Sequence, residues 1–195
     1  MTVFRISPQL FFFIGLSPAI FSGAAVYIVK ASGGIKFSLK HELKKLIFYA
    51  YLLILASITL FPVRYSVSLL GPVFRPSPVN LFPLKTIIQA IGVLGISEFS
   101  FLFKLKTIIS VIFKYLLLFM PIGFFLPQLH KWFQTAVPCL LTALVLSCCF
   151  EVTGYIEASF DLASNRTANI DNVLLAVTGA FIGFRIWRRL CRNCS

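Results

Sequence analysis

The sequence predicts an all-α polytopic membrane protein with about five transmembrane helices, each near the length that a hydrocarbon core of about 30 Å requires. Hydrophobic residues make up 58% of the chain and charged residues only 12%, a balance that soluble domains do not show. The mean hydropathy is +0.92. Long apolar blocks, separated by charges or prolines, account for this value and are typical of membrane-spanning helices.

The predicted spans follow these blocks in chain order. Their bounds are Leu10–Val29, Leu46–Val63, Ile108–Leu126, Thr135–Phe150 and Val173–Trp187. The last two blocks are short, so they need their polar ends to cross a bilayer. A further apolar stretch, Ile87–Phe103, is interrupted by Gln89, by glycines and by Glu98. We interpret it as an interfacial or re-entrant segment.

The chain of 195 residues accommodates one membrane domain with short loops. We divide it into an N-terminal transmembrane helix with a basic cytoplasmic loop (1–45), a membrane domain (46–188) and a basic cytoplasmic tail (189–195). The net charge of +12 would suit nucleic acid. Lysines and arginines that flank membrane spans instead set topology and contact anionic lipid, so we expect membrane lipids and no nucleic acid as partners.

The distribution of basic residues predicts the orientation of the chain. The loops after the first and third spans and the C-terminal tail carry more Lys and Arg than the opposite side. Those residues are Lys30, Lys36, Lys40, Lys44, Lys45, Lys131, Arg185, Arg188, Arg189 and Arg192. By the positive-inside rule, the N-terminus is predicted to lie outside and the C-terminus in the cytoplasm.

This topology brings several polar residues to one outer face. Glu151 follows the fourth apolar block, Arg166, Asn169 and Asp171 precede the last one, and Asn80 lies in the long second loop. A carboxylate at membrane depth is costly and normally faces a partner or a water-filled cleft. We therefore predict that these five residues line one cleft that binds a ligand.

Each residue has a role in this hypothesis and a simpler alternative. Arg166 and the N-terminus of the last helix would bind an anionic group, while Glu151 and Asp171 would accept hydrogen bonds or bind a cation. Alternatively, Glu151 lies in water past the membrane edge, and Asn169 and Asp171 only cap the last helix. Gly179 and Gly183 form a small-xxx-small pattern, which predicts close helix packing within the bundle or between copies.

The sequence shows little sign of the common catalytic and metal sites. Cys191 and Cys194 have metal or redox spacing, but no second cysteine pair or histidine lies near them. His41 and His130 lack metal-ligand spacing, the predicted outer face has no nucleophile–histidine pair, and there is no glycine-rich nucleotide motif. We therefore predict no metal, no cofactor and no catalytic residue. The sequence does not decide whether the protein is an enzyme, but it favours a protein without catalytic activity.

Several motifs, taken in their order along the chain, resemble those of the VanZ-like family. They are Asn80–Pro83, Leu118–Phe124, Glu151 and the run from Arg166 through Asp171 to Gly179 and Gly183. The resemblance covers about Leu46 to Trp187 and implies a four-helix core, to which this chain adds an N-terminal helix. It also implies a small multi-pass protein of the bacterial cell membrane, in a family whose founding member is associated with low-level resistance to teicoplanin-type glycopeptides. The chain departs from the family pattern at Tyr115, Gly154, Asn169, Asn172 and Ala176.

The residues and the resemblance together predict a protein that binds a polar or lipid-linked cell-envelope molecule at an outer-face cleft and affects glycopeptide susceptibility. The expected partners are membrane lipids and a lipid-linked envelope precursor or a glycopeptide. Two alternatives belong to other classes: a membrane-embedded enzyme acting on a lipid headgroup, and a membrane scaffold or accessory subunit. Homo-oligomerisation is left open.

Overall fold

A computed structural model of the protein describes residues 3–18, 39–60, 63–66, 76, 78–95, 100–160, 162 and 167–192. The chain forms two compact units, which are described separately: Met1–Pro76 with Ile156–Arg166, and Ser77–Tyr155 with Thr167–Ser195. Four helices of the described residues are long and apolar enough to cross a membrane. These are Glu42–Leu60, Phe101–Leu129, Ala136–Ser159 and Ile170–Leu190. The predicted all-α polytopic membrane fold is confirmed.

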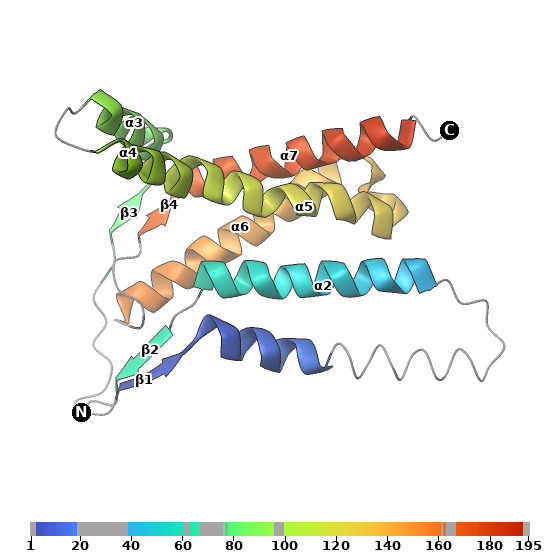
Figure 1. Ribbon diagram of the computed structural model, residues 1–195, viewed down its shortest axis with the longest axis horizontal. Coiled ribbons are helices and arrows are strands. Elements are labelled where there is room, and N and C mark those ends of the chain that lie inside the picture. Colours follow the sequence, from blue (N-terminus) through green and yellow to red (C-terminus); the bar gives the residue numbers. More distant parts are fainter. Residues whose placement is uncertain are drawn as a thin grey trace. The chain divides into compact units, whose positions relative to one another are not determined.

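The first unit contains a short strand pair and two neighbouring helical segments. Strand β1 (Val3–Ile6) pairs antiparallel with β2 (Val63–Ser66). Residues 8–18 are helical and lie beside α2 (Leu39–Leu60) (Figure 1). The Tyr49 hydroxyl on α2 donates to the Gly15 carbonyl at 3.2 Å, and a Cβ at Gly15 would lie 2.7 Å from Leu53 Cδ2. The nearest atom is the end of a flexible side chain, so a larger residue at position 15 would require Leu53 to change its rotamer.

The second unit is built around α5 (Lys114–Leu129) and α7 (Ile170–Arg192), which lie side by side (Figure 1). The helices run in the same direction, because successive α7 positions meet successive α5 positions: Gly179 meets Leu116, and Gly183 meets Met120. Buried side chains of both helices form the core. These are Phe119, Ile122 and Leu126 of α5, with Val173, Ala176, Ala180 and Phe184 of α7. The packing of this core sets how α7 is aligned along α5.

Helix α6 (Ala136–Ser159) returns from α5 after the 3₁₀ turn Lys131–Gln134. The ring of Phe150 on α6 contacts that of Phe119 on α5 edge to face, with centroids 6.3 Å apart. Glu151, the next residue, lies beside the start of α7. The helix continues past Glu151 to Ser159, beyond the predicted end at Phe150.

The segment before α5 consists of two short helices. Helix α3 (Lys85–Gly92) leads into the 3₁₀ turn Val93–Gly95. Helix α4 (Phe101–Ile108) then passes through the π-helical turn Ile109–Phe113 into α5. The sequence predicted one separate segment over Ile87–Phe103, whereas the structure assigns its last residues to the long helix Phe101–Leu129.

The predicted spans differ in how far they can be compared with the structure. Four of the predicted blocks overlap the membrane-length helices. The first block, Leu10–Val29, lies mostly in residues 19–38, outside the described residues. The domain division at residues 45 and 188 stays a prediction.

Candidate functional site

A short parallel strand pair brings two asparagines together. Strand β3 (Val79–Asn80) pairs with β4 (Ala168–Asn169), so that Asn80 lies opposite Asn169. Asn80 Nδ2 donates to Asn169 Oδ1 at 3.0 Å and to Thr86 Oγ1 at 3.1 Å. Asn169 Nδ2 donates to the same Thr86 oxygen at 2.8 Å. Both amides therefore converge on the first turn of α3.

Asp171 caps the N-terminus of α3, a helix far from it in the sequence. Its carboxylate accepts hydrogen bonds from the backbone N–H groups of Leu84 and Thr86, the latter at 2.8 Å. The first N–H groups of a helix have no partner within the helix, and an anion there also interacts favourably with the helix dipole. The Asp171 side chain is only 1% exposed. Asp171 therefore caps α3 and not α7, the helix on which it lies.

Asn169 caps α7 itself. Asn169 Oδ1 accepts the backbone N–H of Asp171 at 3.1 Å, two residues along the chain. This is the usual geometry of an asparagine N-cap. Because the same oxygen also accepts from Asn80 Nδ2, the start of α7 is tied directly to β3.

Glu151 joins α6 to the start of α7. One carboxylate oxygen, Oε2, accepts the backbone N–H of Asn169 at 2.9 Å. The other, Oε1, accepts from Asn172 Nδ2 at 2.9 Å. Glu151 is partly exposed, in contrast to the enclosed Asp171. We call the six residues Asn80, Thr86, Glu151, Asn169, Asp171 and Asn172 the polar cluster.

The polar cluster holds two carboxylates with uncharged partners. Among the described residues, neither Glu151 nor Asp171 forms a salt bridge with a lysine or arginine. Asn80 Oδ1 is buried and accepts no hydrogen bond within this part of the chain. The cluster therefore offers acceptors and negative charge, which suit a hydrogen-bond donor or a cation. In the described ranges no three His, Cys, Asp or Glu side chains gather as a metal site would need.

Most residues singled out in the sequence meet in this cluster. Asn80, Glu151, Asn169 and Asp171 belong to one hydrogen-bonded network. Arg166 lies outside the described residues, so its contribution stays a prediction. Sequence reasoning missed Thr86 and Asn172. The position of Asn172 next to Asp171 was an available signal, whereas nothing in the sequence around Thr86 distinguished it.

Gly179 and Gly183 lie outside the cluster, at the contact of α7 with α5. A Cβ at Gly179 would lie 2.1 Å from the Leu116 carbonyl oxygen, and one at Gly183 would lie 1.9 Å from that of Met120. Gly123 on α5 makes the reciprocal contact, since its Cβ would lie 1.8 Å from the Ala180 oxygen. The two backbones touch, as in other small-residue helix pairs of membrane proteins.

Membrane-length helices packed through small residues, with two acids gathered where α6 and the start of α7 meet α3, define a polytopic helical membrane protein. The chain belongs to the VanZ/LLP1 family, whose model matches residues 48–192. The matched region includes every residue of the polar cluster and both helices of the α5–α7 contact. Comparisons with curated proteins and with solved structures gave no significant match.

Proposed function

We propose that this VanZ/LLP1-family membrane protein binds the polar headgroup of a lipid-linked cell-envelope molecule at the polar cluster. The observation that supports this most directly is the partly exposed Glu151 carboxylate, whose hydrogen-bond partners among the described residues are uncharged. The buried, unpaired Asn80 Oδ1 is a further acceptor in the same cluster. A headgroup bearing hydroxyl or ammonium donors would satisfy these acceptors.

The two acids have different parts in this proposal. Glu151 is partly exposed and each of its oxygens accepts one hydrogen bond, which leaves lone pairs for a ligand. Asp171 is enclosed and holds α3, so it positions the cluster without touching the ligand. Arg166 enters on the sequence prediction alone, as the residue that would bind an anionic part of the same molecule.

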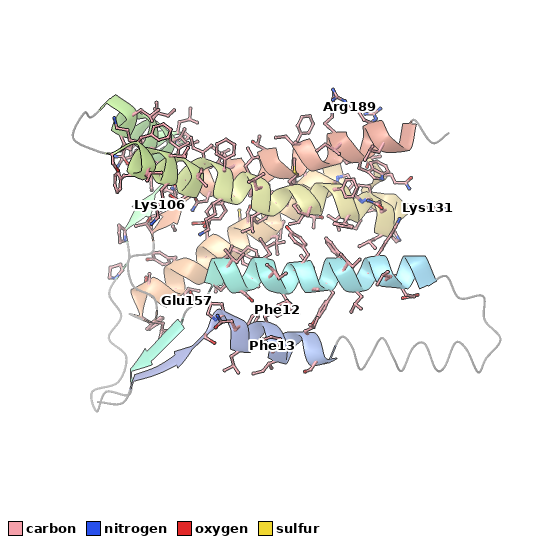
Figure 2. All side chains as sticks on the ribbon, viewed as in Figure 1. Phe12, Phe13, Lys106, Lys131, Glu157 and Arg189 are labelled. Carbon is pink, nitrogen blue, oxygen red and sulfur yellow. The ribbon has the colours of Figure 1, made fainter. Side chains whose placement is uncertain are left out.

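We place the cluster at the outer face of a bacterial cell membrane, with the C-terminus in the cytoplasm. Within the second unit, Lys131 and Arg189 lie at the opposite end from Lys106 (Figure 2). Arg185 and Arg188 are also on the last turns of α7. The positive-inside rule makes the end with Lys131 and the α7 arginines the cytoplasmic one. An outer-face site for an envelope precursor would explain an effect on susceptibility to teicoplanin-type glycopeptides.

Replacing Glu151 by glutamine tests this function with little risk to the fold. The glutamine carbonyl can still accept the Asn169 N–H, and the Asn172 side-chain amide can turn its oxygen toward the glutamine NH₂, whereas the negative charge is lost. Losing one charge-assisted contact predicts about tenfold weaker binding of a polyprenyl-linked peptidoglycan precursor to the protein in nanodiscs. A host expressing the Glu151→Gln variant should also lose any change in teicoplanin susceptibility that the parent protein confers.

The control is Thr178→Val on α7, because the Thr178 hydroxyl only bonds back to the Leu174 carbonyl of its own helix. This variant should bind like the parent. Equal precursor binding and equal susceptibility for Glu151→Gln and the parent, at equal protein levels, would refute a binding role of the cluster.

A further inference from the structure

Helix α3 presents three distinct stripes of side chains. Thr86 and Ala90, one turn apart, face the protein, and Ala90 is only 3% exposed. Leu84, Ile88 and Ile91 share a second stripe and are exposed, Ile88 by 64%. The third stripe carries Lys85 and Gln89, which are also exposed. The outer surface of α3 is therefore half apolar and half polar.

This division identifies the surroundings of α3. A helix in water would not expose a stripe of large apolar side chains, and a helix in the hydrocarbon core would not expose a lysine and a glutamine. A helix with one apolar and one basic or polar stripe lies in the plane of the membrane interface. The preceding loop agrees, because Leu81 and Phe82 are 73% and 74% exposed.

The length of the helix Phe101–Leu129 gives a separate estimate of how deep α4 lies in the membrane. Phe101–Leu129 has 29 residues, so it is about 43 Å long at 1.5 Å per residue. A hydrocarbon core is about 30 Å thick, and fitting the whole helix inside it needs a tilt of about 45°, beyond the usual range of about 0–40°. The excess of about 13 Å matches the eight residues of α4. With Leu129 at the opposite edge of the hydrocarbon core, this excess places α4 at headgroup level.

Basic residues of α3 and α4 are consistent with the same depth, at the headgroups of the membrane. Lys104 on α4 donates through Nζ to the Leu94 carbonyl at 3.0 Å, which ties α4 to the turn after α3. Lys85 on α3 and Lys106 on α4 are exposed. The described residues from 78 to 114 include no acid; Glu98 lies among residues 96–99, outside them. We call α3, the turn Val93–Gly95 and α4 the interfacial platform.

We infer that the interfacial platform binds the bilayer surface, with Leu84, Ile88 and Ile91 among the acyl chains and with Lys85 and Lys106 against the phosphates of anionic phospholipids. The occupant is lipid because α4 continues directly into a membrane-length helix, and its headgroup is anionic because the exposed charges of the platform are lysines. This inference does not depend on the proposed ligand of the polar cluster, since none of these residues belongs to that cluster.

Site-specific fluorescence on the full-length protein in nanodiscs tests the depth of α3. In a background without the native cysteines, a single cysteine is introduced at Ile88 or at the neighbouring Gln89 and is labelled with a fluorophore. We expect lipids brominated on the acyl chain to quench the label at 88 and aqueous iodide to quench the label at 89. Iodide quenching of both labels would place α3 in water, and bromine quenching of both would place it inside the membrane; either result overturns the inference.

The same label at position 88 tests the headgroup. Brominated phosphatidylglycerol should quench it about fivefold or more over brominated phosphatidylcholine, because one basic residue near the surface favours anionic lipid by about that factor. The double variant Lys85→Gln/Lys106→Gln should bring this ratio close to one. The control Lys131→Gln, at the other end of the unit (Figure 2), should leave it unchanged. A ratio near one in the parent, or an unchanged ratio in the double variant, overturns the inference.

Discussion

Replacement of Gly183 by alanine is expected to force α5 and α7 apart and to destabilise the protein by about 3 kcal/mol. The added Cβ would lie 1.9 Å from the Met120 carbonyl oxygen and 3.1 Å from the Phe124 backbone nitrogen. Both neighbours are backbone atoms, so no rotamer change can make room. The helix axes must separate, and the buried contacts of Phe119 and Phe184 are then loosened as well.

The measurement is thermal unfolding of the purified protein in detergent, together with the yield of monodisperse protein. The matched control is Gly92→Ala on α3, where nothing lies within 4 Å of the added Cβ. In a helix, alanine is favoured over glycine by about 1 kcal/mol, so the control should be neutral or stabilising. If both alanine variants unfold at the same temperature as the parent, α5 and α7 do not touch through their backbones.

The sequence predicts the helices of this protein well because a membrane helix needs a long apolar run, and such runs are visible without any knowledge of packing. The ends of the helices are less visible. Glu151 seemed to end a span because it is charged, yet α6 continues to Ser159. Its carboxylate is satisfied by Asn169 N–H and Asn172 Nδ2, donors of α7 and the residue before it, so a charge inside the helix was tolerated. A hydropathy profile contains no information about such hydrogen-bond donors from another helix.

The convergence of polar residues was predictable from topology, but their contacts were not. Alternating spans bring the end of α6, the start of α7 and the second loop to one side, which predicted that Asn80, Glu151 and Asp171 would be neighbours. The partner of Asp171 is the start of α3, 85 residues earlier in the chain for Thr86. Local capping rules favour the nearest helix, and here Asn169 already occupies that position. Only the tertiary structure shows which helix each acid caps.

Replacement of Asp171 by asparagine is expected to release the start of α3 and to destabilise the protein by about 3 kcal/mol. The asparagine amide can accept only one of the two N–H groups that the carboxylate accepts from Leu84 and Thr86, and its NH₂ group would face the other. Leu84 has φ of 65°, a left-handed conformation that costs a residue with a Cβ about 1 kcal/mol or more. The bond from its N–H to Asp171 offsets this strain, so the turn should relax once the bond is lost.

Hydrogen exchange separates this local effect from general unfolding. In Asp171→Asn the amides at the start of α3 should exchange faster, while those of α5 around the buried Phe119 keep most of their protection. Glu151→Gln is the matched comparison, since it also removes one charge from the polar cluster but bonds no atom of α3. It should leave α3 exchange near that of the parent. The same loss of protection in both variants would mean that α3 depends on the charge of the cluster as a whole. Faster exchange confined to Asp171→Asn would identify this carboxylate as the anchor that fixes α3 to the helix bundle.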